Sequence, residues 1–94
     1  MFTLYLEPKG KEIRQFRVYA PSGAMVCASR NRAFNALWLD RYDAHLSGKC
    51  ERFQFTNMSR PSTECEFLGE YDSREDLVNA IEMFALMEDV PYYD

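Results

Sequence analysis

The hydrophobic pattern of the chain changes its period at about residue 31, and this change constrains the fold more than any other feature. Before residue 31, apolar and polar residues alternate, as Phe2, Leu4 and Leu6 do with their neighbours, which is typical of half-buried β-strands. After it, apolar residues recur at spacings of three and four, which is typical of amphipathic helices. A chain that contains both patterns is predicted to form an α+β domain.

Two turn signals divide residues 1–29 into three predicted strands. Residues 8–11 read PKGK and residues 21–23 read PSG, and both contain the Pro and Gly that tight turns favour. The alternation of Phe16, Val18 and Ala20 with polar neighbours identifies the middle strand, and residues 24–29 form the third. We therefore expect an antiparallel meander.

The first helix is predicted to begin after Asn31 or Ser29, either of which can cap it, and to end at Gly48. We expect Asn35 to lie outside its apolar face and Leu39 to lie at the margin of that face. The residues expected on the apolar face are Phe34, Leu37, Trp38 and Tyr42.

The second helix is predicted to begin at Ser73, because Asp76 three residues later completes a variant of the capping box. Met83 and Leu86 project toward its polar side, and residues 89–94 form a short acidic and aromatic tail. The residues expected on its buried face are Leu77, Val78, Ala80, Ile81, Phe84, Ala85 and Met87.

Two further strands are predicted between the helices. Phe53 and Phe55 alternate with polar neighbours, and Cys65 and Phe67 alternate with Glu64 and Glu66. The turn signal at residues 59–62 is compatible with a hairpin between these two strands.

The predicted element order is therefore β-β-β-α-β-β-α, within a single α+β domain that spans residues 1–94. We expect two layers, an antiparallel sheet with both helices packed on one face. The high aromatic content, 15% of residues, supplies a core without metals or disulfides. The opposite face of the sheet is expected to be open to solvent and to display Tyr5, Gln15, Arg17, Tyr19, Gln54 and Glu66.

The net charge of −4 conceals a strong asymmetry along the chain. Residues 1–60 hold ten basic and five acidic side chains, whereas residues 61–94 hold one basic and ten acidic side chains. Such an asymmetry suggests a surface with a charged partner, in this case a protein with a basic surface. The residues expected to bind that partner are Glu64, Glu66, Glu70, Asp72, Glu75, Asp76, Tyr92 and Tyr93.

Nucleic-acid binding is the alternative function. Basic and aromatic residues interleave on the predicted meander, a pattern that suits base stacking combined with phosphate contacts. The sequence pI near 5.0 and the acidic segment oppose attraction to a polyanion. The residues that would form this surface are Tyr5, Lys9, Lys11, Arg14, Arg17 and Tyr19.

Enzymatic, metal-binding and membrane functions are not expected. The single histidine, His45, lies on the apolar side of a predicted helix, and neither a glycine-rich phosphate loop nor a cofactor motif is present. Cys27, Cys50 and Cys65 have long spacings that do not suit zinc, so we expect them to be free, buried thiols in a cytoplasmic protein. No apolar run is long enough to cross a membrane.

In its size, its charge pattern from Glu64 to Asp76 and its lack of catalytic signatures, the chain resembles the small acidic inhibitor proteins of phages and mobile elements, such as anti-CRISPR proteins. The resemblance implies binding to a host defence or nucleic-acid-processing complex. A homodimer formed through Met83, Leu86 or an edge strand remains an open alternative.

Overall fold

A computed structural model describes residues 1–11, 14–21, 24–49, 56–57 and 61–87 of the chain. The elements are β1 (Phe2–Pro8), β2 (Arg14–Tyr19), β3 (Ala24–Ala28), α1 (Arg32–Leu46), β4 (Thr56–Asn57), β5 (Glu66–Tyr71) and α2 (Arg74–Met87). The described elements follow one another in the predicted order, but the strand predicted at Phe53 and Phe55 lies outside the described residues, and β4 comprises Thr56 and Asn57 alone.

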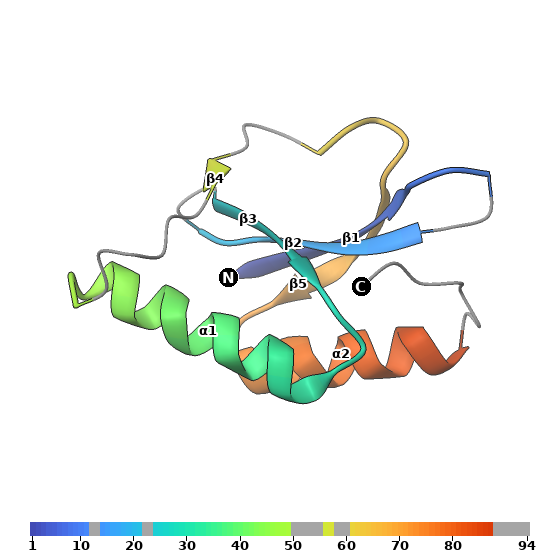
Figure 1. The fold of residues 1–94 in the computed structure, drawn as a ribbon. Coiled ribbons are helices and arrows are strands. Elements are labelled where there is room, and N and C mark those ends of the chain that lie inside the picture. Colours follow the sequence, from blue (N-terminus) through green and yellow to red (C-terminus); the bar gives the residue numbers. More distant parts are fainter. Residues whose placement is uncertain (12–13, 22–23, 50–55, 58–60, 88–94) are drawn as a thin grey trace.

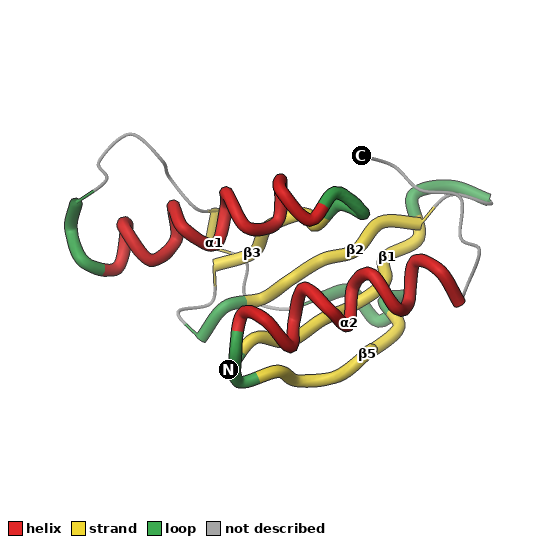
Figure 2. Tube along the Cα trace, turned by 90° about the horizontal axis from the view of Figure 1, so that it is seen from below, coloured by secondary structure: helices red, strands yellow, loops and turns green. Residues whose placement is uncertain are grey.

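The strands form one antiparallel sheet, and both helices cover the same face of it (Figure 1). Figure 2 shows the sheet from the side of the helices. In this view α1 lies in front of the β3 side of the sheet, and α2 lies in front of β1 and β5. The two helices run antiparallel, because Arg32 at the start of α1 contacts Glu82 near the end of α2, and Arg74 at the start of α2 contacts Asp43. The fold belongs to the α+β class, with two layers as predicted.

The strand order in the sheet is β4-β3-β2-β1-β5, which corrects the hairpin considered for the last two strands. β4 pairs with β3 and β5 pairs with β1, so these strands lie at opposite edges, roughly 19 Å apart at the usual strand spacing. The connection between them must cross the sheet, and residues 61–65 lie on the face opposite the helices (Figure 1). That face is therefore partly covered, not open as expected.

The core fills the space between the sheet and the helices. Leu4, Leu6, Phe16 and Val18 point into it from β1 and β2, in agreement with their alternating pattern. The helices contribute Trp38, Leu39, Tyr42, Leu77, Val78, Ala80 and Ile81.

α1 begins and ends where the sequence predicts. The side chain of Asn31 accepts hydrogen bonds from the N–H groups of Ala33 and Phe34 at 2.9 and 3.2 Å, and it caps the helix. Beyond Ser47, Gly48 has a positive φ of 74°, the left-handed conformation that ends helices and favours glycine.

The buried face of α1 differs from the prediction. Asn35 and Leu39 are buried, whereas Phe34 and Leu37 are about half exposed. The helix is turned because the polar Asn35 finds hydrogen-bond partners inside the protein, which a pattern of apolar residues does not reveal. Trp38 and Tyr42 are buried as expected.

α2 is capped by Ser73, whose hydroxyl oxygen accepts a hydrogen bond from the N–H of Asp76 at 3.1 Å. Its predicted buried face is largely confirmed, and Met83 and Leu86 are exposed as expected. Met87 is the exception, because this last residue of the helix is exposed. In the described residues, neither helix combines the length and apolar character needed to cross a bilayer.

β5 carries an irregularity that reverses the predicted orientation of its first residues. Leu4 pairs with Gly69, but Tyr5 pairs with Phe67, so the register shifts by one residue at Leu68. Paired residues share a face of the sheet, so Phe67 lies on the outer face beside Tyr5, and Glu66 lies on the face of Leu6. The sequence pattern had predicted the opposite, with Glu66 on the outer face.

Candidate functional site

The outer face of the sheet, opposite the helices, carries a cluster of aromatic rings. The ring of Tyr5 packs edge-to-face against Tyr19 on β2 and Phe67 on β5, with centroid distances of 5.5 and 5.6 Å. Phe67 joins this outer-face cluster only because of the irregularity in β5, and it is 56% exposed. Sequence reasoning placed Tyr5 and Tyr19 here correctly but missed Phe67.

The basic residues beside this cluster are neutralised by an acidic one. Glu7 forms ion pairs with Arg17 at 2.9 Å and Lys9 at 3.0 Å. Partial burial alone would raise the pKa of Glu7, but the hydrogen bonds and charges of Lys9 and Arg17 together lower it below its usual range. Arg17 also donates a hydrogen bond to the sulfur of Met25 at 2.7 Å, so its guanidinium is held on the sheet.

The segment of residues 61–65 covers part of the outer face and so reduces the area that is open to a partner. Burial raises the pKa of the Tyr19 hydroxyl, and the charge of the neighbouring Cys65 adds to the rise. Its turn is held by the N–H of Cys65, which donates to the carbonyl oxygen of Ser62 at 3.1 Å.

The structure divides the residues predicted to form a nucleic-acid-binding surface. Tyr5, Arg17 and Tyr19 lie together on the outer face, and Lys9 joins them through Glu7. Arg14 instead shares the face of Phe16 and lies 3.9 Å from Glu66, so it does not extend this surface. Lys11 is exposed beyond the end of β1.

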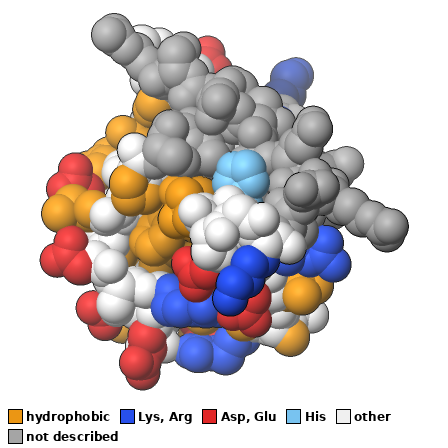
Figure 3. Space-filling view, turned by 90° about the vertical axis from the view of Figure 1, so that its left-hand side faces the viewer, with side chains coloured by type: hydrophobic (Ala, Val, Ile, Leu, Met, Phe, Trp, Pro, Cys, Tyr) orange, Lys and Arg blue, Asp and Glu red, His pale blue; other side chains and the backbone are white. Residues whose placement is uncertain are grey.

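The predicted acidic partner-binding residues that the structure describes are all exposed. They begin just before β5, which is a strand at the edge of the sheet, and continue along β5 into the first turn of α2. We call this surface the acidic edge: Glu64, Glu66, Glu70, Asp72, Glu75 and Asp76. In Figure 3, acidic side chains line the left side of the molecule, and Lys and Arg side chains gather in its lower part together with further acidic side chains. Tyr92 and Tyr93 lie outside the described residues.

The one basic side chain of residues 61–94 is directed away from the acidic edge. Arg74 ion-pairs with Asp40 at 2.6 Å and Asp43 at 3.2 Å and donates to the carbonyl oxygen of Ala36, all on α1. Arg32 of α1 similarly ion-pairs with Glu82. Some of the charged residues of the two segments thus pair with each other and join the helices. Glu70, Asp72 and Asp76, in contrast, form no ion pair within the part of the chain that the structure describes.

Cysteine and histidine residues do not assemble into a site. Among the described residues, no group of three His, Cys, Asp or Glu side chains is arranged to hold a metal ion. Cys27 and Cys65 are free thiols, as predicted, but both are partly exposed where we expected burial, and Cys50 lies outside the described residues, as does Gln54.

The fold and the surface together define an α+β protein with a sheet bordered by carboxylates. No protein-family model, curated protein or solved structure matches the chain.

Proposed function

We propose that the protein is a non-enzymatic binding protein that uses its acidic edge to dock on a basic surface of another macromolecule. The preferred partner is a protein or nucleoprotein complex that handles nucleic acid, as expected from the resemblance to small phage inhibitors. Carboxylates suit such a partner because they accept the paired hydrogen bonds that arginine residues otherwise donate to phosphates.

The observation that carries the proposal is that the side chain of Arg74 points toward α1 and away from the acidic edge. It is the one basic residue in the acidic segment, and its guanidinium is bound to Asp40 and Asp43 on α1. The carboxylates of Glu70 and Asp72 therefore face solvent without a cation beside them in the described structure. Like charges gathered in this way lower stability, and a basic partner relieves their repulsion.

The main chain of β5 supports the same use of this edge. β5 pairs with β1 on one side and has no partner strand on its other side within the described residues. Its free N–H and C=O groups offer a second way of engaging a partner, by addition of an extended segment, while the acidic side chains disfavour addition of a second copy.

A charge-matched pair of variants tests the proposal. Glu70→Gln with Asp72→Asn removes two negative charges from the acidic edge, and Leu37→Lys with Leu46→Lys makes the same net change at exposed positions of α1. The protein is titrated with an arginine-rich peptide and followed by backbone NMR. The peptide is expected to shift the amide signals of residues 64–76, and its affinity is expected to fall at least tenfold in the first double variant only.

Two results would contradict the proposal. The peptide could bind both double variants as tightly as the unmodified protein, or its shifts could centre on Asp40 and Asp43 instead of the acidic edge. A single-stranded oligonucleotide in the same titration tests the alternative function. Binding that shifts Tyr5 and Tyr19 and is lost in Arg17→Ala would favour nucleic-acid recognition on the outer face.

A further inference from the structure

An exposed aromatic ring lies in the middle of the acidic edge. Phe67 of β5 is 56% exposed, and acidic residues precede and follow it along the strand. A single exposed apolar side chain is common on protein surfaces and does not by itself indicate a binding site. Two further features of β5, its irregularity and its place at the edge of the sheet, distinguish Phe67 from such a residue.

The irregularity in β5 brings Phe67 and Glu70 to the same face of the sheet. Residues three positions apart in a regular strand lie on opposite faces. In β5, however, Leu68 packs against the core and Gly69 pairs with a core residue of β1, so two consecutive residues lie on the inner side. Irregularities of this kind commonly redirect a side chain, and here they place an aromatic ring and a carboxylate together on the outer face.

The ring and the carboxylate are close enough for one long side chain to contact both. Phe67 pairs with Tyr5 and Glu70 pairs with Thr3, and these partners are two residues apart on β1, which corresponds to about 7 Å along the strand. Tyr5 packs against Phe67 with a centroid distance of 5.6 Å and supports the ring from one side. Glu70 is exposed and forms no ion pair among the described residues.

The main chain and Tyr71 hold this arrangement in place before a partner binds. Gly69 has a φ of 129°, which residues with side chains rarely adopt. The hydroxyl of Tyr71 donates a hydrogen bond to the carbonyl oxygen of Leu68 at 2.9 Å, beside the irregularity. A surface that is already ordered loses less conformational entropy on binding.

From these observations we infer that Phe67 and Glu70 form an anchor for one arginine side chain of the partner protein. The guanidinium group stacks on the exposed face of the Phe67 ring and donates hydrogen bonds to the carboxylate of Glu70. Arginine fits this anchor better than lysine, because its planar group both stacks on rings and pairs with a carboxylate through two parallel hydrogen bonds. Figure 2 shows β5 at the edge of the sheet, where a partner can approach it. The inference rests on the proposed function and names the contact that selects among cations.

Two peptides of equal length and charge test the inference on the unmodified protein. The arginine-rich peptide is compared with a peptide in which every arginine is replaced by lysine. The arginine peptide is expected to bind about two- to fivefold more tightly, a difference comparable to one exposed cation–π contact. NMR signals of the Phe67 ring are expected to shift with the arginine peptide and to shift less with the lysine peptide.

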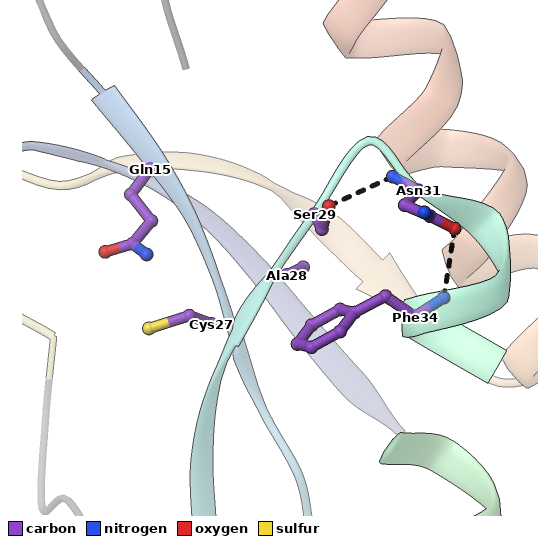
Figure 4. Close-up of a pocket in the computed structure, with 6 residues that line it drawn as sticks. All are labelled: Gln15, Cys27, Ala28, Ser29, Asn31 and Phe34. Atoms are coloured by element: carbon purple, nitrogen blue, oxygen red, sulfur yellow. Dashed lines mark hydrogen bonds between the residues drawn. The ribbon is translucent and has the colours of Figure 1, made fainter. Parts of the chain in front are cut away.

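A matched pair of substitutions tests the role of the ring. Phe67→Leu keeps an apolar side chain and every charge but removes the aromatic face, so the two peptides are expected to bind this variant with similar affinity. Phe34→Leu is the control, because Phe34 is 48% exposed and extends from α1 alongside Ala28 of β3 (Figure 4). Two strands separate β3 from β5, so this variant is expected to keep the full preference for arginine.

A double-mutant cycle tests whether the ring and the carboxylate contact the same arginine. Glu70→Gln is expected to weaken binding of the arginine peptide at least threefold, and the loss caused by Phe67→Leu is expected to shrink at least twofold in this background. Asp72→Asn removes the same charge from the acidic edge at a position beyond the end of β5. The loss caused by Phe67→Leu is expected to persist in full in the Asp72→Asn background.

Equal affinity of the two peptides for the unmodified protein would overturn the inference, and so would a preference for arginine that survives in Phe67→Leu. Additive effects of Phe67→Leu and Glu70→Gln would also overturn it, because the ring and the carboxylate would then contact separate groups. In each of these cases, a loss of affinity in the double variant Glu70→Gln with Asp72→Asn would leave the proposed function standing. Unchanged affinity of that double variant for both peptides would overturn the inference and the proposed function together.

Discussion

The side chain of Asn35 and the main chain of Ser29 form a reciprocal pair of hydrogen bonds in the protein interior. The N–H of Ser29 donates to the Asn35 Oδ1 atom at 2.9 Å, and the Asn35 Nδ2 atom donates to the Ser29 carbonyl oxygen at 2.6 Å. Asn35 is fully buried, so the pair fixes the residue that follows β3 to the first turn of α1 without competition from water.

Replacing Asn35 by leucine is expected to lower the free energy of unfolding by about 2–4 kcal/mol, because both main-chain groups of Ser29 lose a buried partner. Urea denaturation followed by circular dichroism measures the change. Asn79→Ala serves as the control, since Asn79 is exposed on α2 and its loss is expected to cost less than about 1 kcal/mol. An equal effect of both substitutions would show that the buried pair contributes nothing particular.

This pair also explains why the face of α1 was predicted incorrectly. The prediction relied on apolar spacing and therefore placed Phe34 and Leu37 inside and Asn35 outside. The partner of Asn35 is a main-chain group of another element, and main-chain groups leave no trace in the sequence. The beginnings of both helices were predicted correctly because Asn31 and Ser73 cap through hydrogen bonds to residues two or three positions away.

The same distinction applies to the candidate sites. The exposure of Glu70 and Asp72 follows from local composition and was predicted. The position of Phe67 beside Tyr5 was not, because it depends on the irregularity in β5, which the alternation of residues in the sequence does not reveal. The partial cover of the outer face likewise depends on β4 and β5 lying at opposite edges, and pairing between distant strands is decided by the whole sheet.

Gly69→Ala is expected to lower the free energy of unfolding by about 1–3 kcal/mol. Gly69 has a φ of 129°, which side chains other than glycine rarely adopt, and an added methyl group would lie 2.8 Å from the hydroxyl oxygen of Tyr71. That hydroxyl is held in place because it donates to the carbonyl oxygen of Leu68 at 2.9 Å. Thermal unfolding measures the change.

The double variant Gly69→Ala with Tyr71→Phe separates the two causes. Removing the hydroxyl relieves the shortest contact but leaves the ring carbons of residue 71 at 3.1 and 3.2 Å and the unfavourable φ, so the second substitution is expected to recover only part of the loss. Full stability of Gly69→Ala alone would contradict the conformation described for β5.

Arg74→Met is expected to lower the free energy of unfolding by about 0.5–2 kcal/mol, because Asp40, Asp43 and the carbonyl oxygen of Ala36 lose their shared cation. The ion pairs are partly exposed, so 0.5 M NaCl is expected to reduce the difference between the variant and the unmodified protein. Chemical denaturation in urea at both salt concentrations measures this. A difference that salt leaves unchanged would show that contacts of Arg74 other than its charge join the helices.

The ion pairs of Glu7 predict a defined dependence of stability on pH. The pKa of Glu7 is lowered in the folded protein, so between the folded pKa and the unfolded value of about 4.3 the unfolded chain binds more protons. Stability from the ionised carboxylate is therefore fully present above about pH 4.3 and is lost as the pH falls through the lowered folded pKa. Glu7→Gln is expected to be less stable than the unmodified protein at pH 7, and the difference is expected to disappear at low pH.

Urea denaturation of both proteins between pH 2.5 and pH 7 provides the measurement. Glu64→Gln is the control, because Glu64 is exposed and has no ion pair among the described residues, so its substitution is expected to change stability little at any pH. A difference between Glu7→Gln and the unmodified protein that stays constant down to pH 2.5 would mean that Glu7 stabilises the outer face by packing. Glu7 would then not neutralise Arg17 and Lys9, and both cations would be available to a polyanion, which would favour the nucleic-acid alternative over docking through the acidic edge.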